Sequence, residues 1–121
     1  SFDISAPTAS VNELSAEALA SGESFKITVK VKNTGERIGK ETVQLYIHDL
    51  YATYIRPQKE LKGFEKIELD AGEEKEITLT LGYDELGYYD ERGKYMVERG
   101  DFDVFVGDDS MTQNKIRIRI V

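Results

Sequence analysis

The chain has 121 residues, the size of one domain, of which 40% are hydrophobic and 32% are charged. Its net charge of −7 argues against nucleic acid and against an anionic membrane surface as partners, because both attract clustered Lys and Arg. The lack of cysteine excludes a disulfide framework and a thiolate metal site. No apolar run approaches the roughly 18 residues of a membrane span. This composition is compatible with the bacterial cytoplasm and with secretion.

The first 22 residues are the least regular part of the sequence. The window Val11–Ala20 is compatible with a short helix, and an edge strand that ends at Ser21-Gly22 fits equally well. We expect residues 1–22 to form a strand or tether that leads into a single sandwich domain over residues 23–121. The chain starts at Ser1 without an initiator Met or a signal-peptide pattern, which suggests a piece of a longer protein.

Alternation of apolar and polar residues predicts β-strands through most of the remaining chain. The alternating segments are Phe25–Val31, Val43–Ile47, Ile77–Leu81, Phe102–Val106 and Ile116–Ile120. Turn sequences separate them, each with a glycine that we expect to adopt a positive φ: Gly35, Gly72, Gly93, Gly100 and Gly107. Many short strands without long helices predict an all-β fold, a two-sheet antiparallel sandwich.

The core of this sandwich should consist of large apolar residues from the strands. We expect five of them to be buried: Leu45, Ile47, Leu61, Phe64 and Val104. Truncation of any one of them to Ala should lower the free energy of unfolding by about 2 to 5 kcal/mol.

Residues 49–60 form a connection longer than a usual hairpin loop and contain several large apolar side chains. A loop that faces only solvent rarely carries so many, because their exposure favours association. Aromatic residues and Arg also dominate interface energies. We therefore expect this loop to be a docking surface, with five candidate residues: Tyr51, Tyr54, Ile55, Arg56 and Pro57.

The sequence contains no recognisable catalytic constellation. His48 is the only histidine and lies on the polar phase of its strand, without a second His or a Cys to complete a metal or general-base site. The adjacent carboxylates Asp84-Glu85, Asp90-Glu91 and Asp108-Asp109 fall in turns, where such side chains bind backbone amides. Glycoside hydrolysis would need two carboxyl groups placed around a cleft. We therefore expect no catalytic residue, no cofactor and no metal.

Five segments, in this order and with this spacing, form the pattern of a known family. They are Val31-Lys-Asn-Thr-Gly35, Val43-Gln-Leu-Tyr-Ile47, Arg56-Pro57, Lys59-Glu-Leu-Lys-Gly-Phe64 and Gly100-Asp-Phe-Asp-Val-Phe-Val-Gly107. From about Glu23 to Ser110, the chain resembles the fibronectin type III-like domain at the C-terminus of family 3 glycoside hydrolases. The run from Arg56 to Phe64 is the most specific part of the resemblance.

The resemblance implies a fibronectin type III or immunoglobulin-like sandwich without a catalytic role of its own. In such enzymes, mostly β-glucosidases, the catalytic residues belong to other domains, so none is carried over to this sequence. The implied partners are the catalytic domains of the same parent chain, on which this domain would pack through the 49–60 loop. Direct glycan binding is expected to be weak or absent.

Two other functions are compatible with the sequence. A free-standing carbohydrate-binding module would bind polysaccharide through Tyr51, Tyr54, Tyr88 and Tyr89, and it predicts a flat aromatic row on one sheet face. A cell-surface spacer predicts tandem copies in the parent protein.

Overall fold

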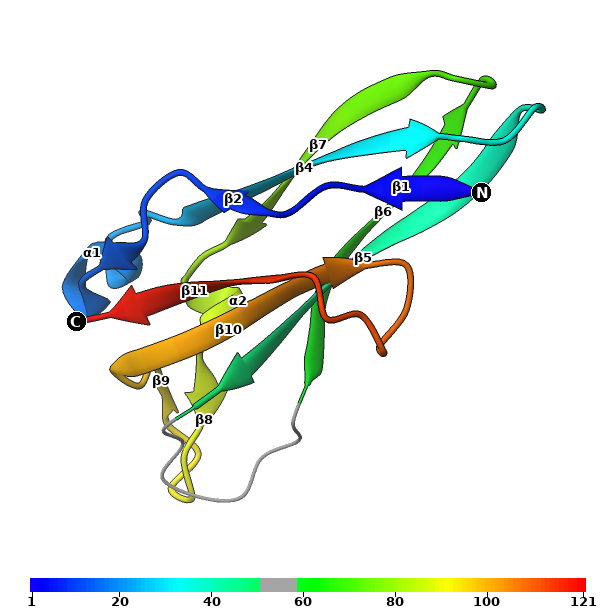
Figure 1. Ribbon diagram of the computed structural model, residues 1–121. Coiled ribbons are helices and arrows are strands. Elements are labelled where there is room, and N and C mark those ends of the chain that lie inside the picture. The colour runs from blue at the N-terminus through cyan, green and yellow to red at the C-terminus, as the bar shows by residue number, and fades with distance from the viewer. Residues whose placement is uncertain (51–58) are drawn as a thin grey trace.

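The computed structural model describes residues 1–50 and 59–121, and the alternating segments form the strands of two stacked sheets (Figure 1). The first sheet centres on β4 (Phe25–Asn33), one edge of which pairs antiparallel with β7 (Glu74–Leu81). The opposite edge of β4 pairs with two short strands, β1 (Phe2–Ile4) and β2 (Thr8–Ala9). The all-β sandwich predicted from the alternation is confirmed.

The second sheet has five strands in the order β3-β11-β10-β5-β6. Their bounds, in that order, are Glu13–Leu14, Lys115–Ile120, Gly100–Gly107, Gly39–Asp49 and Glu60–Leu69. The pairings are antiparallel except between β11 and β3, which run parallel. A separate small hairpin consists of β8 (Tyr88–Tyr89) and β9 (Tyr95–Met96).

The N-terminal segment contributes to both sheets, with β1 and β2 in the first and β3 in the second. The window that fits a helix or a strand contains both, because α1 (Ala16–Ala20) follows directly after β3. Ser15 caps α1 by accepting a hydrogen bond from the backbone N of Ala18 at 2.9 Å, and Leu19 lies in the core. In the described ranges α1 and α2 (Tyr83–Leu86) have five and four residues, too few to cross a bilayer.

The two sheets bury their facing apolar side chains in one core. Three of the five expected core residues, Leu45, Ile47 and Val104, are fully buried there, as predicted. The prediction for Leu61 and Phe64 is wrong, because an irregularity in β6 turns both side chains toward solvent.

The turn glycines act in two different ways. A positive φ is confirmed for three of them: Gly72, Gly93 and Gly100. The prediction is wrong for Gly35 and Gly107, whose φ is not positive. Gly107 is instead required by close packing, because a Cβ atom at this position would collide with the side chain of Thr112.

Asn33 is a buried polar residue whose amide is fully hydrogen-bonded. Its Nδ2 donates to the carbonyl oxygens of Arg37 at 2.8 Å and of Leu69 at 3.0 Å, and its Oδ1 accepts from the backbone N of Gly35 at 2.9 Å. Asn33 therefore joins the end of β4 to the following turn and to the end of β6. Buried polar groups need such partners, because an unsatisfied one destabilises the fold.

The central strand β10 is buried on both faces, although its sequence alternates. Its inward residues fill the core: Phe102, Val104 and Val106. Its outward residues Asp101, Asp103 and Phe105 are also buried, with 8%, 4% and 5% of their surface exposed. A strand at the surface of a sandwich usually has one wet face, so something must cover the outer face of β10.

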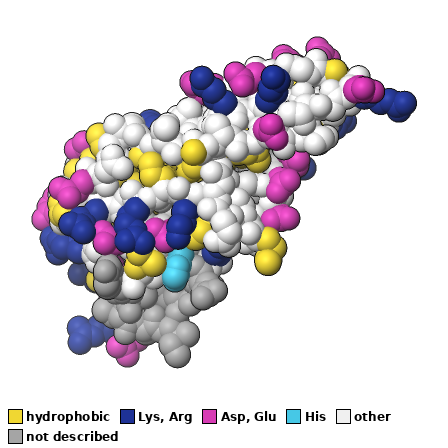
Figure 2. All heavy atoms as spheres, viewed as in Figure 1, with side chains coloured by type: hydrophobic (Ala, Val, Ile, Leu, Met, Phe, Trp, Pro, Cys, Tyr) yellow, Lys and Arg dark blue, Asp and Glu magenta, His cyan; other side chains and the backbone are white. Residues whose placement is uncertain are grey.

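Cations from the neighbouring strand β11 cover the two aspartates. Arg119 Nε donates to Asp101 at 2.7 Å, Arg117 Nε donates to Asp103 at 3.0 Å, and Lys115 Nζ donates to Asp103 at 3.3 Å. The cross-strand register places each arginine directly opposite its aspartate. Figure 2 shows Lys and Arg side chains in a row with acidic side chains between them, on the face where Figure 1 shows β10 and β11. We call these contacts the ion-pair ladder.

The ladder lowers the pKa of both aspartates. For Asp101 the main cause is the hydrogen bond from Arg119. For Asp103 burial is the largest single influence and would raise the pKa, but the hydrogen bonds from Arg117 and Lys115 and the positive charges of these two residues together lower it. Both carboxylates are therefore ionised in the folded protein at pH values where they begin to protonate in the unfolded chain.

Substitution of Leu45 by Ala should lower the free energy of unfolding by about 2 to 5 kcal/mol, because it opens a cavity in the core. Substitution of Leu61 by Ala should lower it by less than about 1 kcal/mol, because this side chain is exposed. Urea denaturation of the two variants measures both effects. Equal losses of stability would contradict the outward orientation of Leu61.

Substitution of Asp103 by Asn should lower the free energy of unfolding at pH 7 by about 1 to 3 kcal/mol, because it weakens charge-assisted hydrogen bonds. A lowered folded-state pKa stabilises the protein above the unfolded-state pKa, which is about 3.9 for Asp. This stabilisation is lost as the pH falls through the folded-state pKa. The difference in melting temperature between wild type and Asp103→Asn should therefore shrink as the pH falls from 5 toward 2. The control Asp108→Asn, at an exposed position, should lower the melting temperature at pH 7 by much less than Asp103→Asn does.

Candidate functional site

The five docking candidates from the sequence lie outside the described residues: Tyr51, Tyr54, Ile55, Arg56 and Pro57. The structure does describe both flanks of this loop. On the first flank, the backbone N of Leu50 donates to the carbonyl oxygen of Asp101 at 3.1 Å. On the second flank lies Lys59, one residue before β6. The candidate site therefore consists of these flanks and the sheet face beside them.

Lys59 ties the second flank to the loop between β10 and β11. Its Nζ donates to the carbonyl oxygens of Ser110 at 2.9 Å and of Thr112 at 2.6 Å. The same ammonium lies 4.1 Å from the ring centroid of Phe105, in cation–π geometry. Lys59 thus covers the part of β10 that the aspartate pairs of the ladder leave uncovered, and it holds the start of β6 in place.

A β-bulge in β6 explains why Leu61 and Phe64 point outward. Tyr46 of β5 pairs with Leu61, but the next residue, Leu45, pairs with Gly63, so Lys62 is an extra residue in the strand. Without the extra residue, positions 61 and 64 would lie on opposite faces of the sheet. With it, both lie on the outer face, where Leu61 is 52% and Phe64 is 59% exposed.

Two half-buried side chains of β5 lie beside these exposed residues on the same face. Tyr46 is directly opposite Leu61, and Gln44 is directly opposite Phe64. The hydroxyl of Tyr46 donates to Oε1 of Gln44, which orients the phenol ring along the sheet. We call Leu61, Phe64 and Tyr46 the β6 patch. It is the part of the candidate site that the sequence analysis missed. The spacing of three between Leu61 and Phe64, which does not fit a regular strand, is the signal that could have identified it.

Three of the described tyrosines, Tyr83, Tyr89 and Tyr95, form a packed cluster. The rings of Tyr83 and Tyr95 are 5.5 Å apart, and Tyr89 meets Tyr95 edge-on at 4.9 Å. The hydroxyl of Tyr95 donates to the carbonyl oxygen of Asp84, and burial, followed by the nearby negative charge of Asp84, raises its pKa. A Cβ at Gly87 would collide with this ring.

The geometry of the cluster does not provide a flat sugar-binding platform in the described part of the chain. Tyr88 and Tyr89 are consecutive residues of β8, so they point to opposite faces. The hydroxyl of Tyr88 donates to Glu98 at 3.1 Å, while Tyr89 is exposed. The edge-on contact also means that the rings of Tyr89 and Tyr95 are not coplanar.

Each of the three carboxylate pairs has a member that binds backbone amides. Glu85 accepts from the backbone N of Gly82 at 2.7 Å, Asp90 accepts from Arg92 and Lys94, each at 2.9 Å, and Asp109 accepts from Met111 at 2.8 Å. These contacts confirm the local role predicted for acids in turns. Asp84-Glu85 lies in α2 and not in an irregular turn.

His48 lies on the outer face of β5, directly opposite Asp103 of the ladder. Among the described residues, no group of three His, Cys, Asp or Glu side chains has the arrangement of a metal site.

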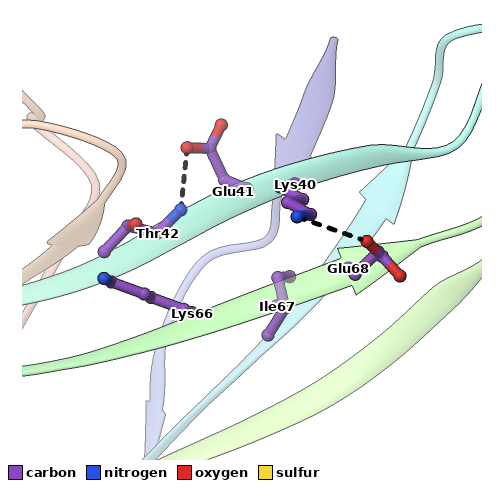
Figure 3. A pocket seen from close by; sticks show the side chains of 6 residues that line it. All are labelled: Lys40, Glu41, Thr42, Lys66, Ile67 and Glu68. Carbon is purple, nitrogen blue, oxygen red and sulfur yellow. Dashed lines mark hydrogen bonds and ion pairs between the residues drawn. The ribbon is translucent and has the colours of Figure 1, made fainter.

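A shallow hollow of about 440 Å³ lies on the segment where the first residues of β5 pair with the last residues of β6 (Figure 3). It is lined by Lys40, Glu41, Thr42, Lys66, Ile67 and Glu68. Lys40 and Glu68 form an exposed ion pair at 3.9 Å, and Glu41 accepts from the backbone N of Thr42 at 3.0 Å. Exposed pairs of this kind are well solvated, so we assign no ligand to the hollow.

Comparison with known proteins identifies the chain by sequence. The family model for the fibronectin type III-like domain matches residues 41–110, more than half of the chain. The thermostable beta-glucosidase B of Acetivibrio thermocellus is 48% identical over 87 residues, which are 71% of this chain and 12% of the relative. The periplasmic beta-glucosidase of Salmonella typhimurium is 37% identical over 111 residues, which are 90% of this chain and 14% of the relative.

Solved structures of β-glucosidases match the fold of this chain over nearly its whole length. A β-glucosidase from Erythrobacter marinus has a TM-score of 0.92 and 37% identity, over 100% of this chain and 15% of that one. The β-glucosidase from Listeria innocua in complex with gluconolactone has a TM-score of 0.88 and 34% identity, over 99% and 16%. The chain thus spans 12% to 16% of the length of these four relatives. The relatives are family 3 β-glucosidases and β-xylosidases, and the match covers only a small part of each. The chain itself belongs to the family of fibronectin type III-like domains.

Proposed function

We propose that this protein is a non-catalytic accessory domain of a family 3 glycoside hydrolase of the β-glucosidase type, where it packs on the catalytic domains of the same chain and stabilises them. One observation carries the proposal: the entire chain superimposes on 15% of the Erythrobacter marinus β-glucosidase at a TM-score of 0.92. A domain that has the same fold as a small part of a large hydrolase is expected to act as part of such a larger chain.

The described geometry supports a structural role. The sandwich has a core of its own, and the ion-pair ladder and Lys59 cover the outer face of β10. Carboxylates that accept hydrogen bonds from nearby backbone amides stabilise the local chain segments between the strands. Such a body is a stable support for a loop that contacts a neighbour.

The loop at residues 49–60 is the proposed contact to the catalytic domains. Its candidate residues remain those inferred from the sequence, namely Tyr51, Tyr54, Ile55, Arg56 and Pro57. Aromatic side chains and Arg supply large contact areas and directional hydrogen bonds at interfaces, and Pro restricts the backbone. The anchored flanks, at Leu50 and Lys59, support a defined position for the base of this loop.

A domain replacement tests the proposal. Deletion of the matching region from the Erythrobacter marinus enzyme should lower its melting temperature and its rate of aryl β-glucoside hydrolysis, and a hybrid enzyme with this chain in that place should recover both. The isolated 121-residue chain should neither hydrolyse an aryl β-glucoside nor bind an insoluble β-glucan. Turnover by the isolated chain, or a hybrid no better than the deletion, would overturn the accessory role.

Substitution of Tyr54 by Ala in this hybrid should weaken docking by about 2 kcal/mol, the effect expected for a central aromatic anchor. The melting temperature of the hybrid should fall, while that of the isolated chain should stay nearly the same. Ile38→Ala is the control, because Ile38 is a large apolar residue with 60% of its surface exposed between β4 and β5. A hybrid whose stability and activity are unaffected by Tyr54→Ala would remove this residue from the interface.

A further inference from the structure

We propose that the β6 patch, formed by Leu61, Phe64 and Tyr46, is buried against an apolar surface of the catalytic domains. This inference rests on the proposed function and adds a second contact, on the sheet itself, to the contact through the 49–60 loop.

The patch is a built feature of the strand. Leu61 and Phe64 share a face only because Lys62 is inserted as a bulge, which interrupts the regular pairing with β5. A break in the alternation that exposes two large apolar side chains is unfavourable for the isolated domain. Departures from local rules of this kind are expected where a surface has a function.

The position of the patch connects it to the docking loop. β6 begins at Glu60, the last residue of the 49–60 loop (Figure 1), and Leu61 is the second residue of the strand. Lys59 fixes this end of the strand to the carbonyl oxygens of Ser110 and Thr112. A partner that reaches the loop therefore also reaches the start of β6, and the patch extends the proposed interface without a gap in the sequence.

The size of the patch favours a partner in the same chain over a second copy. A stable dimer buries roughly 800 Å² on each partner, far more than three side chains offer. Two copies would also each carry a net charge of −7, and their repulsion opposes association. A covalently linked neighbour has a high effective concentration, so a small apolar contact is sufficient. The matched relatives are much longer chains, of which this domain makes up 12% to 16%. We therefore infer that the catalytic domains of the same chain cover the patch.

The test uses the hybrid enzyme described above with the double substitution Leu61→Thr and Phe64→Thr. Thr keeps the strand propensity and removes most of the apolar surface. The matched control is Val11→Thr with Ile38→Thr, since these two apolar residues are 42% and 60% exposed elsewhere on the domain. The readouts are the melting temperature and the rate of limited proteolysis of the hybrid, with the isolated chain measured in parallel.

We expect the double variant to lower the melting temperature of the hybrid and to raise its proteolysis rate at least about tenfold, because two lost anchors increase the undocked population. The isolated chain should melt at the same temperature with and without the substitutions, and the control variant should leave the hybrid unchanged.

Three results would overturn the inference. The first is that the double substitution leaves the melting temperature and the proteolysis rate of the hybrid unchanged, although the unmodified hybrid restores the stability and activity lost in the deletion. The proposed function would then remain intact. The second is an isolated chain that is destabilised as much as the hybrid, which would make the patch internal packing. The third is an isolated chain that sediments as a dimer and becomes monomeric in the double variant, which would make a second copy the occupant. If the unmodified hybrid fails to rescue the deletion, the proposed function and this inference fall together.

Discussion

Burial of β10 on both faces is the constraint on which the rest of the structure depends. Two aspartates on its outer face can be buried only because β11 places a cation opposite each of them. A buried carboxylate without a partner is strongly unfavourable, whereas a paired one with several hydrogen bonds is tolerated. The same strand places Phe105 under the ammonium of Lys59. The outer face of the sheet is thus organised by charge, while its inner face is organised by apolar packing.

This arrangement also determines where the candidate site lies. Both flanks of the 49–60 loop attach to β10 or to the loop that follows it, through the backbone of Leu50 and the side chain of Lys59. The loop joins β5 to β6, and its two ends are therefore held by the most buried strand of the sandwich and by the loop that follows that strand. The β6 patch lies next to the second flank, on an edge strand whose bulge turns apolar side chains outward. Charged residues protect much of this edge strand, as is usual in soluble proteins, so the exposed pair Leu61 and Phe64 is an exception that is consistent with a surface that has a neighbour.

Two motifs of the family resemblance have clear physical roles in the fold. Asn33 uses its whole amide to join three chain segments, which explains an Asn at the end of a strand where an apolar residue would otherwise pack. Gly107 lies under Thr112, which leaves no room for a side chain at the end of β10. Both residues stabilise the sandwich on which the proposed docking surface lies.

The sequence by itself determined the all-β class and the strands β4, β5, β7, β10 and β11, because alternation is a local property with a period of two residues. It did not single out β6, whose bulge interrupts the alternation. It identified Leu45, Ile47 and Val104 as buried and indicated local roles for the acids in turns. Only the tertiary structure decided the exposure of Leu61 and Phe64, because the bulge is defined by the register between β5 and β6. It also decided the burial of Asp101 and Asp103, whose partners lie on another strand. These features depend on which strands become neighbours, and alternation along a single strand contains no information about its neighbour.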